Sequence, residues 1–192
     1  GYNPDAGVKF KIRQEYAAIG TANKYLKTDA SVGGKMEIFN GDLTLMAELQ
    51  AGRLLSLSGN SGVLDRYFAN GDIRGFEYNG LGPRDRSAGN KDALGGNFFA
   101  ATKFEANFPV PLIEGFGMSG GAFYDVGSVW GLDSTAGSAA IVDDGYSLRS
   151  SIGLSLFWKT VIGPLRINYS TALSKKSYDK VQKLDLSVST QF

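Results

Sequence analysis

The sequence predicts an all-β protein whose strands run antiparallel, up and down. Apolar and polar residues alternate along most of the chain, which is the period of strands with two different faces. Glycine supplies 26 of the 192 residues, and phenylalanine and tyrosine are abundant, as they are in β proteins rich in turns. No segment shows sustained helical periodicity.

The composition excludes several classes of function. The chain has no cysteine and no histidine, which removes disulfides, thiol catalysis, imidazole bases and the commonest zinc ligands. Its formal net charge is +1 with interspersed charges, so we expect no nucleic-acid partner. Since no other catalytic or metal-binding constellation is visible, the sequence predicts a protein that is not an enzyme and uses no cofactor or metal.

Three strands are expected in the first third of the chain, at 8–13, 25–39 and 42–57. In the first, Val8, Phe10 and Ile12 alternate strictly with charged residues. Asn40-Gly41 lies between the other two and is the strongest short signal for a hairpin. These strands are longer than those usual in soluble proteins.

Five further strands follow, and each alternates in the same way. In the fourth strand, for example, Phe104 shares an apolar face with Phe98 and Phe108, while Lys103 and Glu105 lie on the polar face. The expected ranges are 95–108, 116–129, 148–158, 165–173 and 184–192.

The connections between the eight strands sort by length. Counted from the first, the odd connections are long and the even ones are tight. Long loops at one end and short turns at the other, with strands that are apolar outside and polar inside, are typical of transmembrane β-barrels of outer membranes. A soluble β-sandwich also alternates, but it buries its apolar face as a core. The sequence favours the barrel, as one domain over residues 1–192.

The longest segment without alternation is a loop at about 59–94, rich in Gly, Asn, Asp and Arg. A loop of this length within a compact β pattern is usually functional. Its apolar and aromatic residues Ile73, Phe76, Tyr78 and Leu81 need a surface to cover. We therefore expect the loop to fold back into the structure with Arg74 as its charged tip, the alternative being an ordinary surface loop.

A series of motifs covers the C-terminal two-thirds of the chain, at 72–76, 82–85, 93–97, 104–109, 123–130, 148–153 and 162–166, and the chain ends on an aromatic residue, Phe192. In kind and in order, these motifs resemble those of the BamA family of outer-membrane protein assembly factors. The first three strands are similar to this family only in pattern.

Members of this family have POTRA domains followed by a sixteen-stranded barrel. The resemblance implies that the eight strands correspond to the second half of such a barrel, strands nine to sixteen, with residues 59–94 as the sixth extracellular loop. Eight strands left open would expose two unpaired edges, so closure into a small barrel is a further hypothesis.

The resemblance also implies a function, namely a non-enzymatic insertase of the bacterial outer membrane. Its partners would be outer-membrane lipid and client β-barrel polypeptides, with accessory assembly lipoproteins as further partners of the full-length protein. The alternatives are a TamA-type or two-partner-secretion translocation barrel, which shares the loop signature, and a small self-contained eight-stranded barrel with a structural role.

For the loop motif Ile73-Arg74-Gly75-Phe76, the resemblance implies that Arg74 reaches into the barrel and contacts Glu105 and Asp125. Both acids also fall on the polar faces of their expected strands, and a guanidinium can bridge two carboxylates with directional bonds. The alternative is that these acids pair with Lys103 or Arg166.

The neighbours of Arg74 have expected roles as well. Gly75 would let the backbone turn sharply or approach the wall, and Phe76 would pack on lumen aromatics such as Phe123.

The last strand is the second candidate site. Leu184, Leu186, Val188 and Phe192 resemble the C-terminal β-signal by which barrel proteins are recognised for assembly. In the family this strand also forms a lateral seam that can template an incoming strand. The alternative is that these residues are simply how any outer-membrane barrel ends.

Overall fold

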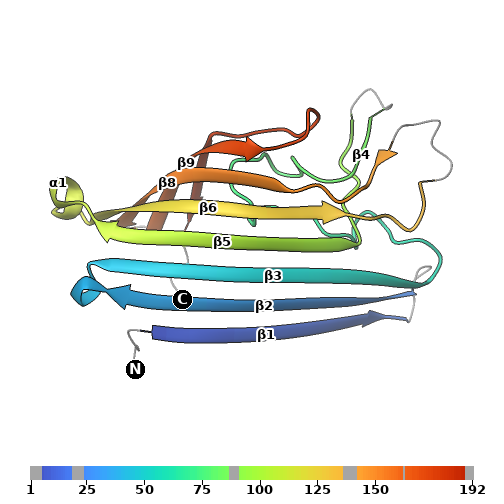
Figure 1. Ribbon diagram of the computed structural model, residues 1–192, viewed down its shortest axis with the longest axis horizontal. Helices are drawn as coiled ribbons and strands as arrows, with labels where there is room; N and C mark the ends of the chain where they lie inside the picture. The colour runs from blue at the N-terminus through green and yellow to red at the C-terminus, as the bar shows by residue number, and fades with distance from the viewer. Residues whose placement is uncertain (1–5, 19–23, 87–90, 136–141, 162, 189–192) are drawn as a thin grey trace.

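The computed structural model describes residues 6–18, 24–86, 91–135, 142–161 and 163–188. Eight strands form one antiparallel sheet in which each strand pairs with the next of the eight along the chain (Figure 1). They are β1 (Ala6–Ala17), β2 (Lys24–Ile38), β3 (Leu43–Ser58), β5 (Phe98–Pro109), β6 (Met118–Trp130), β8 (Arg149–Thr160), β9 (Gly163–Ser174) and β10 (Leu184–Val188). The predicted all-β meander is confirmed, and each expected strand is present within the described residues, the last over Leu184–Val188.

The two ends of the sheet differ as the loop lengths predicted. One end carries the tight turns, with the 3-10 turn η1 (Phe39–Gly41) and the short helix α1 (Pro111–Glu114), and the other carries the long connections (Figure 1). Asn40 and Gly41 both have positive φ, 56° and 94°, which suits the Asn-Gly hairpin. A two-stranded ladder of β4 (Arg84–Asp85) and β7 (Val142–Asp143), which the sequence did not predict, joins two of the long connections.

Helices are a minor part of the fold. The turn after Pro109 was expected to be a simple turn, and it contains the four residues of α1 instead. Pro111 at the start of this helix has a φ already suited to helix and lacks only an N–H that would have no partner there. In the described ranges, no helix is long and apolar enough to cross a membrane.

The apolar face of the sheet points outward and is uncovered. Val8 is 82 % exposed, Leu154 62 % and Leu186 66 %, although each lies in the regular part of a strand. A β-sandwich would bury this face, so the sandwich alternative is excluded. A continuous exposed apolar face around a curved antiparallel sheet is the surface that a transmembrane barrel presents to lipid.

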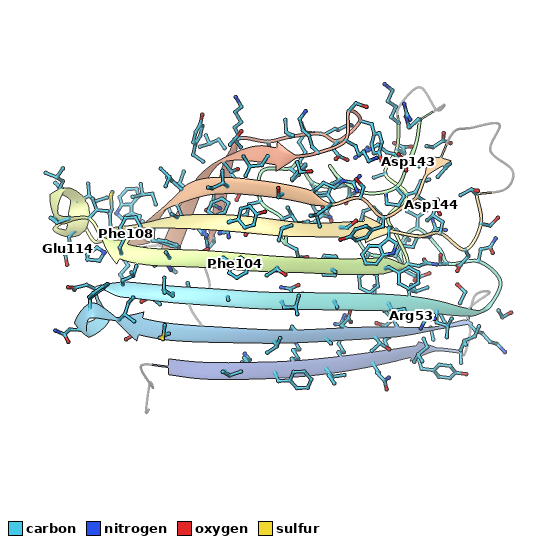
Figure 2. The ribbon with its side chains drawn as sticks, in the orientation of Figure 1. Arg53, Phe104, Phe108, Glu114, Asp143 and Asp144 are labelled. Atoms are coloured by element: carbon cyan, nitrogen blue, oxygen red, sulfur yellow. The ribbon has the colours of Figure 1, made fainter. Side chains whose placement is uncertain are left out.

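Aromatic residues mark both borders of this apolar face. At the loop end, Trp130 stacks on Phe98 and meets Tyr146 edge-on. At the turn end lie Phe108 and Trp158, and Figure 2 shows Phe104 between the two borders on β5. Phe98 and Phe108 are ten residues apart in β5. At about 3.3 Å per residue and a tilt of about 40°, that spans roughly 25 Å, the height of the apolar band of outer-membrane barrels.

The sheet is open where the described residues end. β1 and β10 are its two edges, and no register pairs one with the other among the described residues. The closure hypothesis therefore has no support in the described part of the chain. Both edges expose backbone groups that can pair with a further strand.

The buried core lies on the inner side of the sheet, where the connection from β3 to β5 packs against the strands. Tyr67 lies against Gly52, where a Cβ would come within 2.5 Å of its ring. Ile73 is 1 % exposed and covers Gly127 in the same way. The core residues are Tyr25, Leu54, Tyr67, Ala69, Ile73, Leu81, Phe99, Ala101 and Val129. The connection thus behaves as an internal plug.

Candidate functional site

The loop motif Ile73-Arg74-Gly75-Phe76 lies inside the curved sheet, at the tip of the connection between β3 and β5. Backbone pairing shapes the connection before and after this tip, since Tyr67 bridges Gly96 and Arg84 bridges Ala93. The apolar side chain of Ile73 anchors the tip in the buried core. Ile73, Phe76 and Leu81 therefore cover the inner wall, as the sequence predicted. Tyr78 was expected to do the same, but its side chain is 80 % exposed.

Arg74 contacts both acids that the sequence singled out. Its Nη1 donates to Glu105 Oε2 at 2.6 Å, while its Nε and Nη2 donate to the two oxygens of Asp125 at 2.6 and 2.7 Å. The Arg74 backbone N–H also donates to Asp125 Oδ2 at 3.0 Å. Asp125 is fully buried and the Arg74 side chain is 10 % exposed, so this fork of charge-assisted bonds is nearly dry.

The ring of Phe123 forms the floor of the site. Arg74 Cζ lies 3.6 Å from the centre of this ring, in cation–π geometry. Gly153 leaves the space for the ring, because a Cβ there would come within 2.5 Å of Phe123 Cζ. Phe123 had been expected to receive Phe76, and the guanidinium of Arg74 takes that place instead.

Glu105 is shared between two arginines. Arg166, from β9, donates to the same Glu105 Oε2 that Arg74 contacts, and its guanidinium lies over Phe157. The alternative pairing with Arg166 thus coexists with the Arg74 contact, whereas Lys103 pairs with Asp72 of the loop. Two arginines and two carboxylates balance in charge, which limits the cost of burying them.

Gly75 and Phe76 direct the chain away from the site. Gly75 has a φ of +90°, and a Cβ there would press on the inner wall at Ser151 and Ser170. Glycine is the residue that takes this conformation and approach without strain. Phe76 is partly buried against the apolar core and forms an antiparallel bridge with Val181.

The last strand, β10, is the second candidate site and lies at the edge of the sheet. Leu184, Leu186 and Val188 face outward, are more than 60 % exposed, and pair with Tyr169, Ile167 and Leu165 of β9. Phe192, the fourth residue of the expected β-signal, lies outside the described residues. In the described part, β10 is held by five residue pairs and leaves its other edge free.

The contacts around Arg74 hold the tip of the loop in place. Each of its charged groups already bonds to another charged group of the chain. Within the described ranges, no three carboxylates gather into a set that could hold a metal ion. A cluster whose charged groups all pair with one another holds the loop tip in one position, because removing any one of these groups would leave a buried charge without its partner.

Sequence reasoning missed two parts of the inner surface. The first is Phe123 as the support of Arg74, for which the alternating pattern shows only an inward aromatic residue. The second is a buried ion pair between Arg149 and Asp179, whose side chains are 1 % and 0 % exposed. Asp179 follows a loop of lysines, tyrosine and serine, and nothing local distinguishes it from a solvated acid.

A curved antiparallel meander with lipid-facing apolar side chains, and an internal loop held by a dry arginine cluster, defines an outer-membrane β-barrel protein with a loop folded into its lumen. The chain belongs to the Omp85 superfamily, whose domain matches residues 1–192.

Three relatives support this assignment. The chain is 34 % identical over 190 residues to the outer membrane protein assembly factor BamA of Neorickettsia risticii, which covers 98 % of this chain and 25 % of that protein. It is 29 % identical over 141 residues to BamA of Neisseria meningitidis serogroup B, covering 64 % of this chain and 18 % of that protein. The 50 kDa subunit of the sorting assembly machinery of Saccharomyces cerevisiae is 25 % identical over 169 residues, covering 83 % of this chain and 34 % of that protein.

A solved structure agrees with these sequence relatives. The crystal structure of BamA from Haemophilus ducreyi lacking POTRA domains 1-3 superimposes with a TM-score of 0.81 at 25 % identity, covering 97 % of this chain and 38 % of that one. The chain spans about a quarter of the length of its Neorickettsia relative.

Proposed function

We propose that this chain is the part of a non-enzymatic outer-membrane assembly factor that helps client β-barrel polypeptides to fold and insert. The long connections, including the loop at about 59–94, would face the outside of the cell, and the tight turns the periplasm. Its partners would be outer-membrane lipid and client strands, with accessory lipoproteins joining the full-length protein.

The observation that carries this proposal is the lock at the tip of the loop. Arg74 bonds to Glu105 on β5 and to Asp125 on β6, so one loop residue ties two strands together from inside. A barrel with only a structural role in the membrane does not need a loop residue that connects two of its strands from inside. A barrel whose free edge must open toward lipid gains from a rigid opposite wall.

Three alternative functions can be compared with this proposal. A small self-contained barrel needs its edges to pair, and β1 and β10 do not pair in the described residues. TamA-type and two-partner-secretion barrels share the superfamily and the loop motif. The names of the two bacterial sequence relatives favour assembly over export.

The test is client folding in lipid vesicles that contain this chain. An unfolded eight-stranded client would be added, and its folding would be followed by the mobility shift between boiled and unboiled samples on a gel. Assembly activity requires faster client folding than in empty vesicles, and slower folding again with Arg74→Ala. Equal rates in loaded and empty vesicles would refute the proposal, and transfer of a soluble passenger into the vesicles would assign the chain to the translocation class.

A further inference from the structure

A second buried ion pair lies apart from the Arg74 site. Arg149, the first residue of β8, donates from Nε to Asp179 Oδ2 at 3.0 Å and from Nη2 to Asp179 Oδ1 at 3.3 Å. Its Nη1 donates to the carbonyl of Ser147 at 2.8 Å. Asp179 belongs to the connection between β9 and β10, so the pair ties that connection to the neighbouring strand.

Asp179 also organises its own turn. Its Oδ2 accepts the backbone N–H of Lys176 at 2.7 Å, and its own N–H donates to the Lys176 carbonyl at 3.1 Å. The carboxylate thus serves as both a turn cap and an ion-pair partner, so losing either charge should loosen the turn as well as the pair.

The same connection pairs with the docked loop. Glu77 N–H donates to the Lys180 carbonyl at 3.0 Å, Lys180 N–H to the Gly80 carbonyl at 2.8 Å, and Gln182 N–H to the Gly75 carbonyl at 3.1 Å. A Cβ at Gly80 would come within 2.6 Å of the Lys180 carbonyl oxygen, so this approach needs glycine. Three backbone bonds therefore join the residues next to Arg74 to the residues just before the last strand.

The last strand starts where this pairing stops. Ser170 N–H of β9 donates to the Lys183 carbonyl at 2.8 Å, and β10 begins at Leu184. Beyond this root, β10 is held only by β9 among the described residues.

We propose that Arg149 and Asp179 are positioning residues that join the docked loop and the root of the terminal strand into one unit. Arg74 fixes the loop to β5 and β6, Arg149 fixes the segment before β10 to β8, and the ladder between residues 75–80 and 180–182 connects the two locks. The root of β10 is thereby held by the connection that precedes it. This coupling does not depend on the assembly activity proposed above.

The test uses a disulfide between Phe76→Cys and Val181→Cys. These two residues are antiparallel bridge partners, whose Cβ atoms lie within reach of a disulfide, and the chain has no native cysteine. The rate of disulfide formation after refolding into detergent micelles would be compared in three backgrounds: unchanged, Arg149→Gln, and Asp179→Asn. Each single change leaves a buried charge without its partner, so the disulfide should form roughly tenfold more slowly.

A control pair and a rescue variant separate positioning from general folding. Ser31→Cys with Gln50→Cys, paired across β2 and β3, should form its disulfide at an unchanged rate in all three backgrounds. The double variant Arg149→Gln with Asp179→Asn keeps the shape and removes both charges, so it should recover much of the lost rate at 76 and 181.

Two results would overturn the proposal. An unchanged rate at 76 and 181 in both single variants means that the ion pair does not hold the junction. Loss of both disulfides means that the pair supports the whole sheet. Amide exchange at Ser170 provides a second readout, because its N–H donates to the Lys183 carbonyl at the root of β10. This N–H should exchange faster in the single variant Arg149→Gln than in the unchanged protein.

Discussion

Arg74 Cζ lies 3.6 Å from the centre of the Phe123 ring, and its Nε, Nη1 and Nη2 donate to Asp125 and Glu105. Each interaction constrains a different direction. The ring fixes the height of the guanidinium, and the two carboxylates fix its rotation. The tip of a long loop is thereby held at one point on the inner wall of the sheet.

Arg74→Ala should release the loop tip while leaving the strands folded. The change leaves Asp125 buried without its main donor, which costs about 3–5 kcal/mol for a buried pair. Limited proteolysis of the refolded protein should then cut the connection between β3 and β5 faster.

Arg13→Ala is the matched control for this change. Arg13 pairs with Asp29, but its side chain is 62 % exposed, and exposed pairs contribute little. Its digestion pattern should match that of the unchanged protein. Identical patterns for both variants would contradict the lock.

Gly153→Ala should disturb the same site from behind. The added methyl group would come within 2.5 Å of both Phe123 Cζ and the Tyr169 carbonyl oxygen. Phe123 is 3 % exposed and lies against the guanidinium of Arg74. Overpacking of this kind costs about 1–3 kcal/mol. The measurements are the melting temperature in detergent and the rate of proteolysis of the loop. The melting temperature should fall and the loop should be cut faster, as in Arg74→Ala. Gly34→Ala is the control, since the nearest atom to its Cβ is 3.9 Å away.

Leu154→Lys should impair insertion into lipid. Leu154 lies midway along β8 on the outward face, where a lysine at the bilayer midplane costs about 2–4 kcal/mol. The yield of protease-protected protein in vesicles should fall. Leu112→Lys, in the exposed helix α1 beyond the aromatic border, should insert as well as the unchanged chain. A normal yield for Leu154→Lys would place this face away from lipid.

Asp133 should give the connection after β6 a stability that depends on pH. Its burial favours the protonated form, but hydrogen bonds from Ser56, the Ser61 backbone and Asn97 outweigh this and hold its pKa below the ordinary value of 3.8. A carboxylate whose pKa is lower in the folded protein stabilises the fold at any pH above its pKa in the unfolded chain. This stabilisation is lost as the pH falls through the pKa of the folded protein.

Amide exchange at Ser61, which bonds to Asp133 Oδ2 at 2.6 Å, measures this effect. Protection of Ser61 should be constant above about pH 4 and fall below it, once the intrinsic exchange rate is corrected. Asp133→Asn should show weaker protection with no such fall. A fall of equal size in both proteins would assign the pH dependence to another group.

The positions of the strands and the directions of their side chains could be predicted from the sequence. Val8, Phe104 and Leu154 face outward as their alternation predicted, because the side-chain period of a strand is a local property of its backbone. The hairpin at Asn40-Gly41 has the same origin, since positive φ is a preference of those two residues. Of the candidate site, Arg74, Glu105 and Asp125 could be singled out by motif and by face.

Which groups meet across the lumen could not be predicted, because it depends on how the whole chain folds. Glu105 takes both Arg74 and Arg166, Phe123 receives Arg74 rather than Phe76, and Asp179 finds Arg149 thirty residues earlier in the chain. These contacts depend on the curvature of eight strands and on the path of the loop inside them, neither of which is encoded in a local pattern. A buried charged side chain pairs with the oppositely charged group that the fold places within about 3 Å, because burying an unpaired charge would strongly destabilise the folded protein.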